Sequence, residues 1–196
     1  HDNFQIGVDD SRDPVQLDGV ETVVLPYDSG VSAGRNAGLV QIQSEFMLCL
    51  DDDFVFNRQT DLMQVVSDIQ AQPDIDILAG EVIYLPLRIV HSYAQTPVFA
   101  TGKQPLKTPG SLIGGFPVHL KVPNFYIARS DRIRLVGWDE KLKRLDHADF
   151  FSRAVGVLTV VQNSDFKVLH YPTYFSKRYL DKRNDTHHDQ IVLQLK

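Results

Sequence analysis

The sequence predicts an α/β fold in which helices flank a mainly parallel central sheet. Short apolar runs alternate with stretches of helical periodicity along the first half of the chain, a pattern typical of strands joined by crossover helices. With 43% hydrophobic and 23% charged residues, the 196 positions also have the composition of an ordinary globular domain with a substantial core. We therefore expect residues 1–196 to form a single domain.

The first half of the chain contains four predicted strands and two predicted helices. Apolar runs place the strands at residues 4–8, 21–25, 46–50 and 75–82. Amphipathic periodicity predicts helices at residues 33–43 and 61–72. Ser32 is the expected cap of the first helix, and Pro73 ends the second. The run at residues 46–50 is uninterrupted, which favours a strand buried on both faces.

The second half of the chain has a less regular pattern. Frequent prolines and glycines predict a long loop at residues 105–115. Further strands are expected at residues 124–128, 157–161 and 166–169, and further helices at residues 130–135 and 146–154. The last residues, 190–196, favour neither helix nor strand.

The charge and the cysteine content argue against several classes of protein. The formal net charge of −5 gives no support to a nucleic-acid partner. No apolar run approaches the roughly 20 residues that span a bilayer. Cys49, the single cysteine, lies in a predicted strand, where we expect a small core residue. The lack of an internal disulfide fits a reducing compartment.

Three consecutive acids, at residues 51–53, follow the predicted strand at residues 46–50. Like charges this close raise one another's pKa unless a positive group lies between them. Asp oxygens are suitable ligands for Mg²⁺ or Mn²⁺, and open α/β sheets bind ligands at the carboxyl ends of strands. A metal site and a solvated acidic turn are both consistent with the triplet alone. A second acidic pair, Asp9 and Asp10, ends the first predicted strand.

Three longer stretches give the chain a family resemblance. Residues 25–56 contain the elements GVSAGRNAG and DDDFVF, residues 122–137 read VPNFYIARSDRIRLVG, and residues 145–156 read LDHADFFSRAVG. In this order they resemble the family 2-like inverting nucleotide-sugar glycosyltransferases of the GT-A fold, and in particular the β-1,4-N-acetylgalactosaminyltransferase group. The joint order of the motifs is specific, whereas any one of them alone would be weak, and the resemblance covers roughly two thirds of the chain.

The resemblance implies a metal-dependent inverting glycosyltransferase with a Rossmann-like sheet. Such an enzyme moves a sugar, here GalNAc or GlcNAc, from a UDP-sugar to a glycan or other hydroxyl acceptor, and Mn²⁺ or Mg²⁺ stabilises the departing diphosphate. It also implies a nucleotide-binding half at residues 1–83, an acceptor and catalytic half at residues 84–176, and a basic C-terminal segment at residues 177–196.

The metal ligands implied by the resemblance are Asp51, Asp53 and His170. Asp53 would bind the metal directly, whereas Asp51 would face either the ribose or the metal. A lone His is more often structural. His170, however, follows a late strand, where this fold commonly supplies a third ligand, and neutral imidazole binds Mn²⁺ well.

The residues expected to bind the nucleotide sugar are Asp10, Arg35, Asp51, Asp52, Lys177 and Arg178. Asp10 matches the strand-end acid that reads the uracil edge in this fold, and a turn-forming Asp is the alternative. Arg35 would approach the nucleotide or diphosphate, or would pair with an acid at the sheet edge. Lys177 and Arg178 would close over the diphosphate, or would form a solvated surface run.

The catalytic base is expected among residues 146–149, at the start of a predicted helix. Inverting enzymes of this fold use an acid there to deprotonate the acceptor hydroxyl. His147 falls where the base Asp usually lies, and imidazole has a suitable pKa for the role. Asp146 or Asp149 could serve instead, with His147 contacting sugar or phosphate.

One departure from the family pattern concerns the start of the chain. The fold normally opens with a strand and a helix before the strand at residues 4–8, and the sequence lacks this unit. We expect either a trimmed piece of a longer protein or a compact variant, with membrane contact only through segments outside these residues. Bacterial relatives work in the cytoplasm at the inner membrane and animal relatives in the Golgi lumen. We favour the cytoplasm and leave both open.

Two other functions compete with sugar transfer. A nucleotidyltransferase would need a Gly-rich phosphate loop directly after the first strand, and the sequence has none there. A catalytically degenerate domain that binds nucleotide or glycan without turnover is favoured by the absent opening unit and by the altered base motif.

Overall fold

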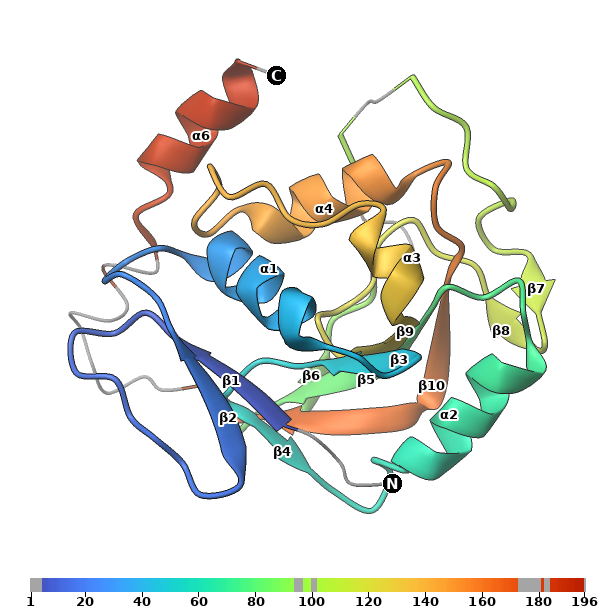
Figure 1. Cartoon of the computed structure of the whole chain (residues 1–196). Helices are drawn as coiled ribbons and strands as arrows, with labels where there is room; N and C mark the ends of the chain where they lie inside the picture. Colours follow the sequence, from blue (N-terminus) through green and yellow to red (C-terminus); the bar gives the residue numbers. More distant parts are fainter. Residues whose placement is uncertain (1–4, 94–96, 100–101, 173–180, 182–183, 196) are drawn as a thin grey trace.

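A computed structural model describes residues 5–93, 97–99, 102–172, 181 and 184–195 (Figure 1). Its centre is a six-stranded sheet in the order β3-β9-β5-β10-β4, with β6 paired to β5. The strands are β3 (Phe46–Cys49), β4 (Phe54–Phe56), β5 (Ile77–Tyr84), β6 (Ile89–Val90), β9 (Tyr126–Arg129) and β10 (Val160–His170). Separate two-stranded sheets are formed by β1 (Gln5–Asp9) with β2 (Val20–Val24), and by β7 (Leu112–Ile113) with β8 (Phe116–Pro117).

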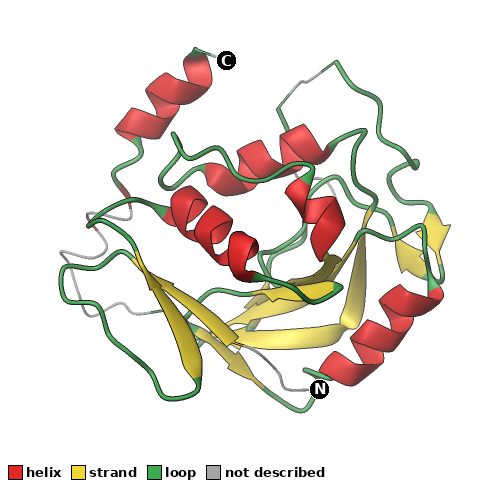
Figure 2. Cartoon of the chain, viewed as in Figure 1, coloured by secondary structure: helices red, strands yellow, loops and turns green. Residues whose placement is uncertain are grey.

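Helices cover both faces of the central sheet (Figures 1 and 2). Three of them, α1 (Val31–Gln41), α3 (Ser130–Arg134) and α4 (Asp146–Ala154), lie on one face, and α2 (Leu62–Ala71) lies on the other. The last helix, α6 (His187–Gln194), contacts the loop that leads into α4. This arrangement confirms the predicted α/β class with flanking helices.

The alternation of side chains along the central strands produces two hydrophobic cores. In β5, Ile77 and Ala79 belong to the core beneath α1, α3 and α4, whereas Leu78 belongs to the core beneath α2. Successive side chains of a strand point to opposite faces, so a strand covered on both sides reads as one continuous apolar run. This is why the run in β5 is recognisable in the sequence.

Two expectations about the sheet need correction. The sheet is mixed, because β5 and β10 run parallel while β9 and β4 run antiparallel to their neighbours. An apolar run looks the same in either direction, so the pattern did not distinguish the two. Among the described residues β3 also lies at an edge of the sheet, and three of its four residues are only half-buried. The prediction of a strand buried on both faces was therefore wrong, although Cys49 is buried as expected.

The local signals at the element boundaries were only partly correct. Asp61 caps α2 by accepting a hydrogen bond from the backbone N–H of Gln64 at 3.0 Å. The predicted cap of α1 was wrong: Gly30 is the capping residue, and Ser32 is buried as the second residue of the helix. The two strands predicted near the end of the sheet are one continuous strand, β10.

The β1–β2 pair is hydrogen-bonded to no strand of the central sheet within the described residues. Among the described residues, no helix combines the length and the apolar character needed to cross a membrane.

Candidate active site

Asp53 and His170 meet where β4 and β10 lie side by side. The two strands pair antiparallel with His170 opposite Phe54, so Asp53, which immediately precedes β4, lies beside His170. The backbone N–H of Tyr171 donates to the Asp53 carbonyl oxygen at 2.9 Å and holds the two segments together. The distance from His170 Nε2 to Asp53 Oδ2 is 2.9 Å. The register of the strands therefore creates this pair.

The surroundings of the pair leave two polar atoms without a partner. Asp53 Oδ1 and His170 Nδ1 are buried and have no hydrogen-bond partner within the described part of the chain. The His170 ring is flanked edge-on by Tyr84 at 4.7 Å and by Phe54 at 5.6 Å between ring centroids. These rings pack edge-on against the imidazole. An unpaired buried carboxylate oxygen is costly unless a positive group approaches it.

The spacing of the pair suits a divalent cation. At 2.9 Å, either a neutral His170 Nε2–H donates to Asp53 Oδ2, or a metal ion lies between the Nε2 lone pair and the carboxylate. Two ligand atoms about 2.1 Å from an octahedral ion lie roughly 3.0 Å apart when they are adjacent in its coordination sphere. Among the described residues, no cluster of three or more His, Cys, Asp or Glu side chains is placed to hold a metal ion. Asp53 and His170 are therefore a pair, and not a complete set of metal ligands, within the described residues.

Arg35 connects the acidic triplet to the start of α4. Its guanidinium forms ion pairs with Asp146 and, at 3.1 Å, with Asp51, and the Arg35 and Asp146 side chains are only 13% and 5% exposed. Burial opposes the charge of Arg35, but its acidic neighbours outweigh burial and raise the Arg35 pKa. Burial raises the pKa of the Asp146 carboxyl, and Arg35 opposes that rise. Arg35 therefore pairs with acids, as one of its two predicted roles required, and this pairing occupies one oxygen of Asp51.

His147 lies one residue further along α4 and is held by its own hydrogen bond. Its Nε2 is 2.7 Å from the Val122 carbonyl oxygen. Because a carbonyl oxygen only accepts hydrogen bonds, Nε2 carries the proton and Nδ1 keeps a lone pair. Burial lowers the His147 pKa to about 4, and the bond to Val122 only partly offsets this. The ring is thus neutral near neutral pH, and its lowered pKa makes it a weaker base than an ordinary imidazole, contrary to the expectation of a suitable pKa.

Asp149 has a different environment from the other candidates for the base. Its buried carboxylate accepts a hydrogen bond from Arg153 Nε at 2.7 Å. Arg153 also donates to the carbonyl oxygens of Val136 and Gly137, at 2.6 and 2.8 Å. The Asp149–Arg153 pair therefore joins α4 to the turn after α3.

The remaining predicted residues are more scattered. Asp10 Oδ2 accepts a hydrogen bond from the Gly30 backbone N–H at 2.8 Å, which ties the end of β1 to the start of α1. Asp52 is exposed in the turn before β4. Lys177 and Arg178 lie outside the described residues.

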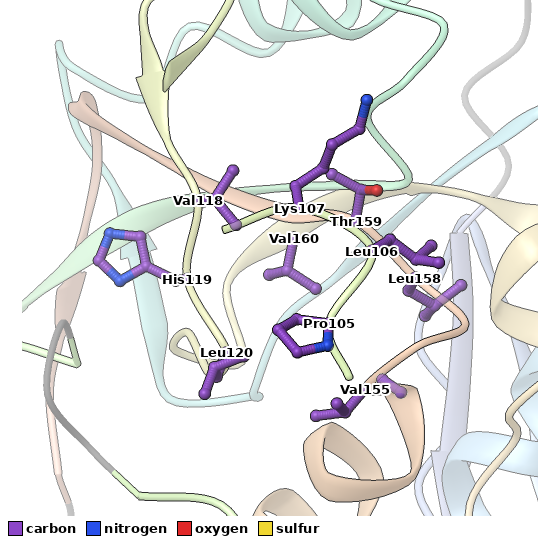
Figure 3. Close-up of a pocket in the computed structure, with 11 residues that line it drawn as sticks. Pro105, Leu106, Lys107, Val118, His119, Leu120, Val155, Leu158, Thr159 and Val160 are labelled. Carbon is purple, nitrogen blue, oxygen red and sulfur yellow. The ribbon is translucent and has the colours of Figure 1, made fainter. Parts of the chain in front are cut away.

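A small cavity lies elsewhere in the molecule, between the 105–107 loop and β10 (Figure 3). Its volume is about 10 Å³, and Val118, Leu158 and Val160 are among its lining residues. That volume is enough for about one water molecule. This cavity is too small for a nucleotide sugar and contains none of the predicted site residues.

The family of the chain follows from comparison with known sequences. Residues 2–115 match the model of the family described as "Glycosyl transferase family 2". The chain belongs to glycosyltransferase family 2. The family predicted from the sequence motifs is thereby confirmed.

Curated relatives of this family 2 glycosyltransferase domain include two named N-acetylgalactosaminyltransferases. The chain is 33% identical over 178 residues to β-1,4 N-acetylgalactosaminyltransferase 1 of Rattus norvegicus, covering 83% of the chain and 32% of the relative. It is 32% identical over 162 residues to β-1,4 N-acetylgalactosaminyltransferase 2 of Mus musculus, covering 79% and 31%. The chain thus spans about a third of the length of the curated relatives it matches.

Solved structures confirm that the family 2 domain has the GT-A glycosyltransferase fold. S. aureus TarS 1-349 in complex with UDP matches with a TM-score of 0.63 at 18% identity, covering 86% of this chain and 51% of TarS. The mannosyltransferase PcManGT from Pyrobaculum calidifontis, in complex with GDP-Man and Mn²⁺, matches with a TM-score of 0.54 at 14% identity, covering 90% and 47%. At these identities the likeness concerns the fold.

One residue of this region was not predicted from the sequence. Asp189 of α6 is buried, and its carboxylate accepts hydrogen bonds from three consecutive backbone N–H groups at residues 143–145. Nothing local marks Asp189, because its hydrogen-bond partners lie more than 40 positions earlier in the chain.

Proposed function

We propose that this family 2 glycosyltransferase moves a sugar, GalNAc or GlcNAc, from a UDP-sugar to a hydroxyl group of a glycan, with inversion at the anomeric carbon. The observation that carries the proposal is the Asp53–His170 pair, whose 2.9 Å spacing and unpaired buried Asp53 oxygen suit a divalent cation. Kinship with N-acetylgalactosaminyltransferases supports the class of sugar.

In this proposal Asp53 and His170 would hold Mn²⁺ or Mg²⁺ beside the diphosphate of the donor. Divalent ions at phosphate sites are commonly bound by one or two protein carboxylates together with substrate phosphates, so two protein ligands suffice. When bound, the ion supplies the positive charge that stabilises the departing UDP. Asp51 as a further metal ligand stays a prediction. Arg35 contacts one of its carboxylate oxygens.

We assign the proton acceptor to His147. The acceptor hydroxyl oxygen attacks the anomeric carbon, the bond from that carbon to the diphosphate oxygen breaks, and UDP leaves with the electron pair. The hydroxyl proton passes to His147 Nδ1, the ring nitrogen that does not donate to Val122. Asp146 serves less well in this role, since its carboxylate is 5% exposed and paired with Arg35.

The other predicted residues act on the donor in this proposal. Asp10, at the end of β1, reads the uracil edge with the carboxylate oxygen that does not accept from Gly30. Asp52 lies exposed beside the metal ligand Asp53 and contacts the donor. Lys177 and Arg178 compensate the charge of the diphosphate.

Release of UDP from UDP-GalNAc and UDP-GlcNAc, with glycan acceptors and with Mn²⁺ or a chelator, tests the proposal. We expect Mn²⁺-dependent release, and the Asp53→Asn variant should lower kcat by about a hundredfold because it removes a charged metal ligand. The control is Asp165→Asn, which removes the same charge from an exposed side chain on β10 and should leave kcat unchanged. UDP release that is equally fast with a chelator contradicts the metal-dependent mechanism.

A domain that binds nucleotide without turnover is the second candidate. The separate β1–β2 pair, which is followed by Asp10 and lacks a strand connection to the central sheet in the described residues, favours it. The same assay separates the two functions. Mn²⁺-dependent UDP binding with no product from either donor supports the binding domain.

A further inference from the structure

The three residues that lead into α4 present their backbone N–H groups to one carboxylate. Asp189 accepts hydrogen bonds from Lys143 at 3.0 Å, Arg144 at 2.6 Å and Leu145 at 2.8 Å. Asp189 is 1% exposed and lies in the first turn of α6. Hydrogen bonds from several amides to an ionised carboxylate are stronger than neutral ones, so this contact fixes α6 against the 143–145 loop.

The opposite side of the 143–145 loop contacts the start of α1 and the turn before it, through Asp28 and Val31. Lys143 Nζ donates to the Asp28 carbonyl oxygen at 2.6 Å, and Arg144 forms an ion pair with the Asp28 carboxylate at 3.2 Å. The Val31 backbone N–H donates to the Lys143 carbonyl oxygen at 3.1 Å. The loop is therefore clamped between α6 and the start of α1.

The clamped loop determines where α4 begins. Leu145 is the capping residue of α4 and makes no side-chain capping bond, so the position of the helix start depends on the backbone contacts around it. Asp146 and His147 follow directly, and Arg35 holds Asp146 from the other side. A change in the loop would therefore move both side chains relative to the rest of the site.

We infer that Asp189 is a positioning residue for the transfer reaction: through the three N–H groups of the 143–145 loop, α6 holds the start of α4 so that His147 meets the acceptor hydroxyl. The inference rests on the proposed function. Asp189 acts through the loop and contacts none of the proposed metal ligands in the described structure. It should therefore affect turnover and leave donor binding nearly unchanged.

The Asp189→Asn variant tests this inference. Asn keeps the shape of the side chain but replaces one accepting oxygen with an NH₂ group, which cannot accept from the loop. We expect backbone amide exchange at residues 143–145 to accelerate by about tenfold or more. We expect kcat to fall by roughly tenfold, since a small misplacement of a catalytic group is costly, while the Kd of UDP with Mn²⁺ stays within about threefold.

Two further variants define the comparison. Asp189→Glu keeps the charge and should retain more of the kcat than Asp189→Asn. Asp185→Asn removes a charge from an exposed residue just before α6 and should change neither amide exchange nor kcat. Unchanged kcat in a folded Asp189→Asn variant, or an equal loss of kcat in the Glu and Asn variants, overturns the inference.

The outcomes remain distinguishable if the proposed function or the variant fails. In the wild-type protein the amides of residues 143–145 should exchange slowly although they lie in a loop, and fast exchange overturns the docking of α6 whether or not Asp189→Asn folds. Wild-type protein that transfers no sugar, with slow exchange at these amides, refutes the proposed function and with it the positioning role. The docked helix would then be purely structural.

Discussion

Asp53 and His170 are 117 positions apart in the chain and 2.9 Å apart in space. Each residue alone has a weak signal: one is the last of three consecutive acids, and the other is a single His after a strand. Their meeting depends on the antiparallel register of β4 and β10, which places His170 opposite Phe54. At the scale of residues, therefore, the chemistry of the side chains was predictable, while their contact depends on strand pairing.

His147 makes a prediction about pH at this scale. Its pKa in the folded protein, about 4, lies below the ordinary value of 6.5, so the unfolded chain binds a proton more readily. The resulting stability is fully present above the ordinary value and is lost as the pH falls through the folded pKa. Between neutral pH and about pH 5, we expect the wild type to lose roughly 1–2 kcal/mol more unfolding free energy than His147→Gln.

Urea unfolding at a series of pH values measures this difference. The His187→Gln variant, which changes an exposed His of α6, is the control and should follow the wild type. Parallel pH curves for the wild type and His147→Gln contradict the buried, neutral state of this ring.

At the scale of elements, α1 and α4 are joined at their N-terminal ends. Arg35 of α1 pairs with Asp146 of α4, and the Lys143 carbonyl oxygen accepts from Val31. The acidic triplet is drawn into the same contact because Arg35 also binds Asp51. Arg35 of α1 therefore contacts both the acidic triplet, next to the proposed metal ligand Asp53, and the start of α4, next to the proposed base His147.

Gly30 provides a test of how tightly these elements meet. It has a φ of 94°, and a Cβ at this position would lie 2.7 Å from the backbone Cα of Lys143. Gly30→Ala therefore adds a backbone collision to an unfavourable conformation, and we expect a loss of about 3 kcal/mol of unfolding free energy or more. Chemical unfolding monitored by circular dichroism measures the loss.

Gly110 is the matched control for this substitution. Its φ of 84° is similar, but a Cβ there would meet nothing within 4 Å. Gly110→Ala should cost only the conformational strain, about 1 kcal/mol. Equal losses for the two variants would show that the α1–loop contact is looser than the structure has it.

At the scale of the whole molecule, the sequence predicted the layers better than the topology. The apolar run at residues 75–82 identified the strand β5, and the helix predicted at residues 61–72 matches α2, which Asp61 caps. Strand direction was not predictable, since parallel and antiparallel partners leave the same apolar pattern. The edge position of β3 was missed for a related reason. Its pairing partner, β9, lies about 80 positions later in the chain, and the sequence of β3 does not identify it.

The same distinction applies to the candidate site. The resemblance to a family supplied the residue types, and the structure supplied their contacts: Asp53 with His170, Arg35 with Asp146, and His147 with Val122. Asp189 was invisible in the sequence, because an acid that binds three distant backbone N–H groups leaves no motif.

The most direct test of the central claim, that Asp53 and His170 hold a cation beneath the diphosphate, is calorimetric titration of UDP with Mn²⁺ and with a chelator. We expect the wild type to bind UDP at least about tenfold more tightly with Mn²⁺, and Asp53→Asn to bind equally weakly in both conditions. Wild-type UDP affinity that is the same with Mn²⁺ and with the chelator would contradict the claim.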